Sequence, residues 1–210
     1  NESGDFSIYL SDRYGFNNPD SEWDKREGVI LIGDSFTHGA CVPQGKDIAS
    51  QIRIISNTPV LNLGYGGNGP LQELAILTEY SIPADIKSIV WLYFEGNDLF
   101  DLANEIGASA SYIPYINGNF KRGMAKYQKE IDDNLLLFID KERQEKEEHL
   151  KEIEKNTISQ ILVLRHIRNL LKTDFRVDLV KNDNVVEINP LFEEILQRAK
   201  VLSSELGAEL

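Results

Sequence analysis

Three short turns of the sequence carry the residue types that acyl-transfer chemistry needs. A Gly-Asp-Ser turn ends at Ser35 after the apolar run VILI, the glycine-rich stretch NLGYGGNG contains Gly67, and EGND contains Asn97. Ester cleavage through a serine needs a nucleophile and hydrogen-bond donors aimed at the developing oxyanion. Ser35 offers a hydroxyl and a backbone N–H, Gly67 offers a backbone N–H, and Asn97 offers a neutral amide.

Each of these turns also has an ordinary structural explanation when it is taken alone. Asn97 and Asp98 suit a turn, and Gly67 suits a sharp loop before a helix. A Gly-Asp-Ser tripeptide occurs by chance in about one chain in twenty of this length. The three turns together favour a shared site, because each follows a strand-like run and parallel strands end at one edge of a sheet.

The elements that must position these turns alternate between apolar runs and helical spacing. We expect strands at 28–34, 60–64 and 88–95, with the first strand between the other two. Apolar residues at helical spacing predict helices at 45–56 and 70–82. Strands separated by helices predict a parallel sheet with helices on both faces, an α/β fold.

The remaining parts of the chain do not follow this alternation of apolar runs and helical spacing. Residues 1–27 are polar and turn-rich, and predict an extended arm or hairpin. A loop rich in Gly, Ser and Asn at 104–119 precedes a long helix at about 126–172, whose charged middle, 141–155, is typical of a solvated helix. We expect an insertion over about 104–172, mainly helical, beside the site of a single domain. Fewer than three clean heptads argue against a coiled coil.

The carboxyl-terminal part repeats the strand and helix alternation. Helical spacing runs from Pro190 to about Leu206 and stops at Gly207. The last three residues, 208–210, resemble the start of another strand. The carboxyl-terminal strands of a doubly wound sheet are therefore expected to be missing from this sequence.

Composition and charge exclude several classes of function. The chain has 210 residues, 41% of them hydrophobic, and a net charge of −12, which argues against nucleic-acid partners and anionic membranes. It contains no run of 18 apolar residues that could span a membrane. Cys41 is the single cysteine, so no internal disulfide can form, and we expect it to pack in the helix after Ser35 rather than to catalyse.

The three turns resemble three of the four sequence blocks of the SGNH hydrolases, also called the GDSL family. GDSFTHG is similar to the first block, NLGYGG to the second and EGND to the third, and the resemblance covers residues 28 to about 100. It implies a flavodoxin-like three-layer α/β/α fold and an esterase or acyltransferase that needs no metal or organic cofactor.

The resemblance also implies the roles of individual residues. It makes Ser35 the nucleophile and Asn97 an oxyanion donor. The oxyanion glycine falls on Gly67, with Gly66 and Gly64 as alternative registers.

The family's fourth block, Asp-x-x-His, has no counterpart among the three histidines of the chain. His38 lies one helical turn beyond Ser35 and is poorly placed to receive its proton. His149 lies in the charged helix, and His166 lies among apolar helical positions. We therefore expect the general base to be a histidine beyond residue 210.

The arm offers the only indication of the substrate. The segment DRYGFNNPD resembles segments that precede SGNH domains in bacterial envelope-polysaccharide proteins. This similarity favours acetyl or other acyl groups on carbohydrate, with lipid esters as the next alternative. It also favours a periplasmic or secreted location over the cytoplasm.

Two other classes of function stay open. One is a non-catalytic SGNH-like module that binds glycan or protein, consistent with the absent histidine. The other is a flavodoxin-like nucleotide binder with GDSFTH as its phosphate loop, which the acidic charge and the lack of lysine in that turn disfavour.

Overall fold

A computed structural model describes residues 8–81, 85–108, 111–118, 120–162 and 190–210. The chain divides into two compact units, Asn1–Lys126 with Val186–Leu210, and Tyr127–Val185. The elements of the first unit are η1 (Asp20–Asp24), β1 (Glu27–Gly33), α1 (Ser35–His38), α2 (Ile48–Ser56), β2 (Val60–Asn62), α3 (Pro70–Tyr80), β3 (Asp85–Leu92), α4 (Asp98–Ala108), η2 (Ile113–Ile116) and α7 (Pro190–Glu205). The 3-10 turn η3 (Met124–Tyr127) leads into α5 (Gln128–Leu162).

The described strands form a three-stranded parallel sheet in the order β2-β1-β3, which confirms the predicted order. Ile30 at the centre of β1 pairs in register with Leu61 of β2 and with Ile89 of β3. β3 occupies Asp85–Leu92 rather than the predicted 88–95, because the chain leaves the sheet at Tyr93 and Phe94, before the turn at 95–97 that leads into α4.

A fourth chain segment pairs with the outer side of β3. Glu209, just after α7, forms a parallel bridge with Ser88. The backbone N–H of Ile89 donates to the Glu209 carbonyl at 2.7 Å, and the Glu209 N–H donates to the Lys87 carbonyl at 3.2 Å. The strand-like character predicted for residues 208–210 is therefore present as a single bridge.

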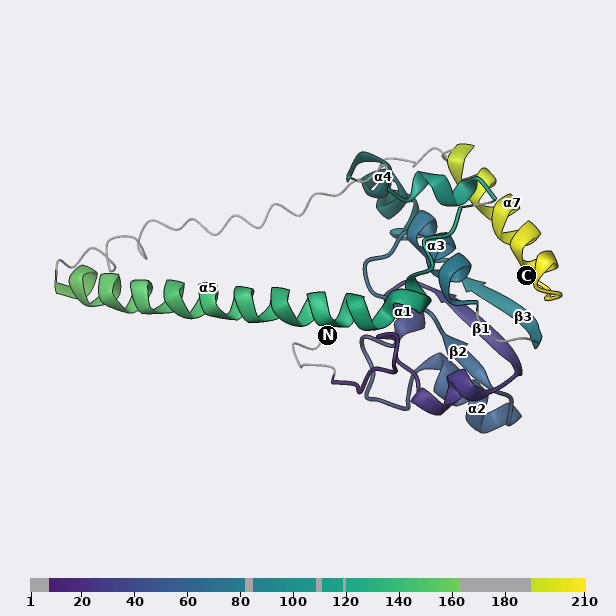
Figure 1. The fold of residues 1–210 in the computed structure, drawn as a ribbon, viewed down its shortest axis with the longest axis horizontal. Helices are drawn as coiled ribbons and strands as arrows, with labels where there is room; N and C mark the ends of the chain where they lie inside the picture. Colours follow the sequence, from purple (N-terminus) through teal and green to yellow (C-terminus); the bar gives the residue numbers. More distant parts are fainter. Residues whose placement is uncertain (1–7, 82–84, 109–110, 119, 163–189) are drawn as a thin grey trace. The chain divides into compact units, whose positions relative to one another are not determined.

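Helices cover both faces of the sheet, giving the predicted three-layer α/β/α arrangement (Figure 1). Alternate residues of a strand point to opposite faces. Ile30 and Ile32 of β1 accordingly join the cluster that contains α3 and α7, whereas Leu31 packs with Ala49 of α2 on the other face.

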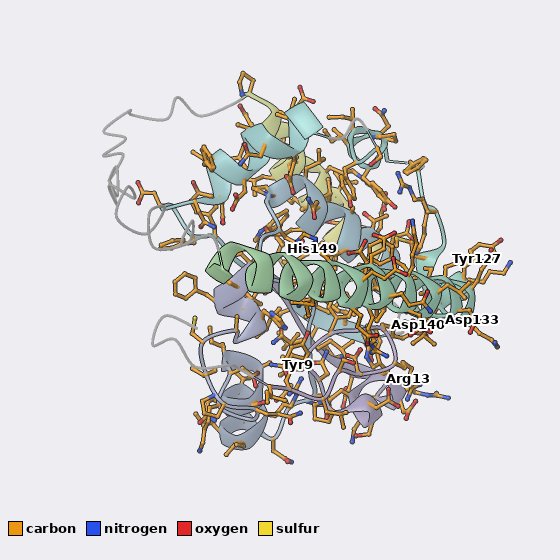
Figure 2. All side chains as sticks on the ribbon, turned by 90° about the vertical axis from the view of Figure 1, so that its left-hand side faces the viewer. Tyr9, Arg13, Tyr127, Asp133, Asp140 and His149 are labelled. Atoms are coloured by element: carbon orange, nitrogen blue, oxygen red, sulfur yellow. The ribbon has the colours of Figure 1, made fainter. Side chains whose placement is uncertain are left out.

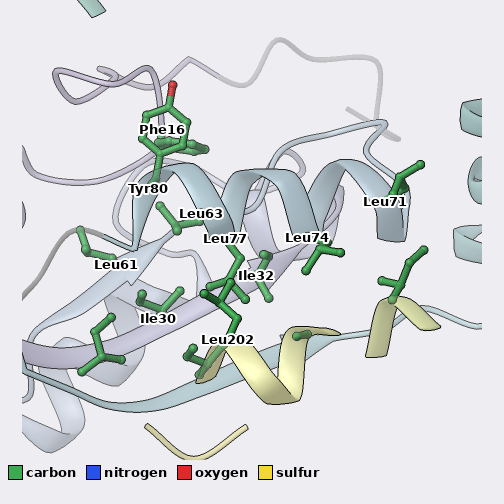
Figure 3. Packing of buried hydrophobic residues seen from close by; sticks show 14 of the residues in the cluster. Phe16, Ile30, Ile32, Leu61, Leu63, Leu71, Leu74, Leu77, Tyr80 and Leu202 are labelled. Carbon is green, nitrogen blue, oxygen red and sulfur yellow. The ribbon is translucent and has the colours of Figure 1, made fainter. Parts of the chain in front are cut away.

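The larger hydrophobic core lies between the sheet and α3 (Figure 3). Leu71, Leu74 and Leu77 repeat at helical spacing along α3 and are fully buried. Pro70 suits the first position of this helix because that position needs no backbone N–H donor. Each buried leucine stabilises the fold by roughly 1.5–3 kcal/mol.

The predicted loop at 104–119 is wrong in its first part, because α4 continues to Ala108. Leu102 is fully buried in the core, and Glu105 is held by the first turn of α3. These tertiary contacts outweigh the turn-rich composition that favours a loop.

The amino-terminal arm belongs to the core rather than extending away from it. Phe16 is buried with its ring centroid 5.1 Å from that of Tyr80 in α3, and Tyr14 stacks edge-on against Trp23 at 4.5 Å. Arg13, labelled in Figure 2, forms ion pairs that tie this segment to η1.

The second unit contains α5, whose 35 residues match the predicted long helix as far as Leu162. Side chains 141–150 of its charged middle are all exposed, and charged residues such as Asp140 project from it (Figure 2). Lys129 pairs with Asp133 one helical turn away at 3.0 Å. That α5 belongs to one domain with the sheet, and that it lies beside the site, stay predictions.

Candidate functional site

The three predicted turns emerge at the carboxyl-terminal edge of the sheet. Ser35 follows β1 as the first residue of α1, Gly67 lies between β2 and α3, and Asn97 lies between β3 and α4. This edge is where ligands bind in open parallel α/β sheets.

Ser35 sits on a helix of one turn whose start is capped by Asp34. The Asp34 carboxylate accepts from the Phe36 backbone N–H at 2.9 Å. Its second oxygen, Oδ2, lies 3.5 Å from Ser35 Oγ, a long hydrogen bond. Ser35 is partly buried and Asp34 is buried, so a carboxylate fixed in the core orients the serine.

The far end of α1 is held by two asparagine side chains. Asn62 at the end of β2 donates from Nδ2 to the Thr37 carbonyl at 2.7 Å, and Asn17 of the arm donates to the His38 carbonyl at 2.9 Å. A helix of one turn is unstable by itself, because the free-energy cost of nucleating a helix exceeds the stabilisation that a single turn provides. Neighbouring strands and the arm therefore keep Ser35 in place.

Two glycines allow α1 to press against the ends of β1 and β2. A Cβ at Gly64 would lie 2.5 Å from Thr37 Cβ and 2.6 Å from the His38 backbone nitrogen. A Cβ at Gly33 would meet the Thr37 hydroxyl and lie 2.8 Å from the Leu92 carbonyl. Any side chain at either position would displace α1 and with it Ser35.

Asn97 reaches the same carboxylate oxygen as Ser35. Its Nδ2 donates to Asp101 at 2.8 Å and to Asp34 Oδ2 at 3.4 Å. Ser35 Oγ and Asn97 Nδ2 thus both lie within 3.5 Å of one atom, Asp34 Oδ2. A reacting oxygen near Asp34 could take over the longer of the two bonds that Asn97 donates.

The glycine-rich turn approaches Ser35 at Gly66. A Cβ at Gly66 would lie 3.7 Å from Ser35 Cβ and 4.0 Å from His38 Nδ1. Gly67 has a φ of +85°, a conformation that other residues adopt only with strain, and a Cβ there would meet nothing within 4 Å. The structure thus brings Gly66 beside the serine, and the choice of Gly67 as oxyanion donor stays a prediction.

His38 is buried between two aromatic rings. The Tyr65 ring stacks on it at 5.3 Å between centroids, and Tyr9 meets it edge-on at 4.8 Å. Burial lowers the pKa of His38, so the imidazole is neutral near pH 7. Its buried Nε2 has no hydrogen-bond partner among the described residues, and Ser35 Oγ donates to Asp34 instead.

The other two histidines stand apart from this arrangement. His149 is exposed on α5, as predicted for a solvated helix face. His166 lies outside the described residues.

Cys41 differs from the prediction that it packs in a helix. The helix ends at His38, because Gly39 adopts a left-handed conformation with a φ of +78°. Cys41 therefore lies in the loop after α1, where its side chain is exposed.

A group of buried carboxyl groups behind Asn97 was not anticipated from the sequence. Glu105 accepts backbone N–H bonds from the first turn of α3, including that of Gly69 at 2.9 Å. Asp98 accepts from the Phe94 N–H at 2.6 Å, and Glu73 accepts from the Trp91 indole. The available signal was the spacing of the acidic residues at positions 98, 101 and 105, which places them on one face of α4.

These carboxyl groups hold protons more tightly than usual. Burial, followed by the nearby Asp98 carboxylate, raises the pKa of Glu73 to about 9, so Glu73 is protonated at pH 7. Burial also raises the pKa of Asp98 to about 6. The proton on Glu73 removes one negative charge from a group that also contains Asp98 and Glu105.

No protein-family model matches this chain, and none of the curated proteins or solved structures compared gives a significant match. Within the described part of the chain, no helix is both long and apolar enough to cross a membrane. The same residues contain no group of three or more His, Cys, Asp or Glu side chains suited to a metal ion.

Replacing Gly64 tests the close approach of α1 to the strand ends. Gly64→Ala should destabilise the fold by about 1–3 kcal/mol, the usual cost of overpacking, because its methyl group would collide with α1. Urea unfolding followed by circular dichroism measures the change.

Gly107→Ala is the matched control, since a Cβ at Gly107 in α4 meets nothing within 4 Å. It should be neutral or stabilising by up to about 1 kcal/mol. Equal stability of the two variants would contradict the described packing of α1.

Replacing Glu73 tests its protonation. Between its ordinary pKa of 4.5 and its folded pKa of about 9, the folded protein keeps a proton that the unfolded chain releases. Stability from this group is complete below pH 4.5 and falls as pH rises, by up to about 1.4 kcal/mol per pH unit. Glu73→Gln should therefore be more stable than the native chain at pH 8, with a difference that shrinks toward pH 4.5.

Urea unfolding at several pH values measures this difference. Glu194→Gln, at an exposed position of α7, should leave the pH dependence unchanged. A native-like pH slope in Glu73→Gln would show that Glu73 is ionised in the folded protein.

Proposed function

We propose that this protein is a serine-dependent esterase or acyltransferase with Ser35 as its nucleophile. One observation carries the proposal: Ser35 Oγ and Asn97 Nδ2 both face Asp34 Oδ2 at the carboxyl edge of a parallel sheet. A nucleophile and a neutral amide donor around one position suit the tetrahedral intermediate of acyl transfer. The resemblance of the three turns to SGNH hydrolases supports the same roles.

In the proposed reaction, Ser35 Oγ forms a bond to the acyl carbon of an ester. The carbonyl oxygen becomes an oxyanion, held by the backbone N–H of Ser35, the N–H of Gly67 and the amide of Asn97. The bond from the acyl carbon to the alcohol oxygen then breaks, and the alcohol leaves with the proton from Ser35. Water or a second alcohol attacks the acyl-serine and restores the hydroxyl.

The general base is assigned to a histidine of the Asp-x-x-His type, which these 210 residues do not contain. His38 is a poor candidate because it is buried between Tyr9 and Tyr65. The arm favours acyl esters of envelope carbohydrate as the substrate class.

A non-catalytic module that binds glycan or protein is the second candidate. The observation that favours it is that no histidine among the described residues hydrogen-bonds to Ser35, whose hydroxyl donates to Asp34 instead. Such a module would keep the arrangement of residues at the carboxyl-terminal edge of the sheet without catalysing a reaction.

Substitutions in the protein expressed from its complete coding sequence separate the two candidates. Ser35→Ala should abolish turnover of p-nitrophenyl acyl esters, because no other group forms the acyl-enzyme. Asn97→Ala should lower kcat by roughly 10²–10³, the usual effect of removing one oxyanion donor. His38→Ala should have a much smaller effect.

Two exposed residues supply matched controls, Ser204 in α7 and Asn104 in α4, and their alanine variants should keep full activity. Circular dichroism and urea unfolding show whether each variant is folded. Ester turnover that survives Ser35→Ala overturns the nucleophile, and turnover lost in His38→Ala overturns the assignment of the base.

A further inference from the structure

A pocket of about 250 Å³ opens directly beside Ser35. Its walls come from α1, from the loop after it and from the start of α2. The lining residues are Ser35, Phe36, Gly39, Cys41, Val42, Lys46, Asp47 and Ile48.

The loop that forms the pocket is fixed at both ends. Gly39 ends α1 in a left-handed conformation, and Asp47 caps α2 by accepting from the Ser50 backbone N–H at 2.9 Å and from its hydroxyl at 2.7 Å. Both oxygens of the Asp47 carboxylate are therefore engaged by the helix rather than offered to a ligand.

The pocket walls are mostly apolar, and some of that apolar surface faces solvent. Phe36 is 55% exposed and Ile48 is 40% exposed, with Val42 and the Cys41 side chain completing the wall. Phe36 is held in place by the Phe94 ring at 4.8 Å. Exposed apolar side chains that line a pocket are typical of a binding site for an apolar ligand.

We propose that this pocket binds an aliphatic acyl chain of the ester that Ser35 attacks. The inference rests on the proposed function and names the acyl part of its substrate. Ser35 lines the pocket, so a chain inside it lies beside the residue proposed to attack its carbonyl carbon. A carbohydrate alcohol fits this lining poorly, since Asp47 is engaged by Ser50 and only the Ser35 and Lys46 side chains remain to hydrogen-bond sugar hydroxyl groups.

The size of the pocket limits the length of the chain. A volume of about 250 Å³ holds roughly eight water-sized groups, so chains of about four to eight carbons fill it. Acetyl groups would leave most of the apolar wall exposed to water.

Binding can be measured without turnover, because Cys41 is the single cysteine of the chain and lies in the pocket wall. In the Ser35→Ala protein, methyl hexanoate at about ten times its Kd should slow alkylation of Cys41 by iodoacetamide about tenfold. Methyl acetate at the same concentration should not. Intact-protein mass spectrometry follows the rate.

Two substitutions on α2 give a matched pair. Ile48→Trp fills the pocket and should remove the protection of Cys41, whereas Ile55→Trp, at an 82% exposed position outside the pocket, should keep it. Val42→Phe is a second filling variant for use if Ile48→Trp fails to fold. Protection that survives both filling variants, or none in the Ser35→Ala parent, overturns the proposal.

The complete protein tests the same pocket through its activity. kcat/KM for p-nitrophenyl esters should rise from acetyl to hexanoyl and fall beyond octanoyl. Ile48→Trp should lower kcat/KM for the hexanoyl ester by about tenfold or more while leaving the acetyl ester within about twofold.

The two readouts separate failure of the pocket from failure of the proposed function. Protection of Cys41 without any turnover supports the pocket and overturns the enzymatic function. Turnover with no preference for chain length and no protection overturns the pocket and leaves the function standing.

Discussion

The candidate site depends on one buried carboxylate, that of Asp34. It is 1% exposed, and it accepts from the Phe36 backbone N–H while its other oxygen faces both Ser35 and Asn97. A buried carboxylate is costly unless hydrogen-bond donors surround it, so these groups must gather at Asp34. These donors come from the ends of β1 and β3, which are neighbours in the sheet with Gly33 opposite Leu92.

Hydrogen bonds from the amino-terminal arm also support the candidate site. Asn18 donates from Nδ2 to Asp12 and to the Asn62 carbonyl, and its Oδ1 accepts from the Asn62 backbone N–H. Asn62 in turn holds the Thr37 carbonyl of α1. Polar groups of the arm therefore reach α1 through a continuous series of hydrogen bonds, which explains why a segment before the first strand belongs to the site.

The local sequence pattern was sufficient to predict the sheet and the residues that lie at its edge. The apolar runs around Ile30, Leu61 and Ile89 end in glycine-bearing turns, so the strands and their order follow from simple rules of parallel sheets. The position of Ser35 and Asn97 at one edge follows from the same rules.

What the sequence could not show depends on contacts between distant segments. Glu105 caps α3, 33 to 36 residues earlier in the chain, and this contact keeps α4 helical where composition favours a loop. The protonation of Glu73 arises from burial, which residue type alone does not show. Cys41 left the helix because Gly39 ends it early.

The identity of the nucleophile is the central claim, and trapping the acyl-enzyme tests it most directly. The complete protein is mixed with p-nitrophenyl hexanoate, quenched with acid during turnover, digested and analysed by peptide mass spectrometry. We predict a hexanoyl group on Ser35, and none anywhere on the Ser35→Ala protein. A hexanoyl group on Cys41 instead, or turnover with no acylated peptide, would contradict the account.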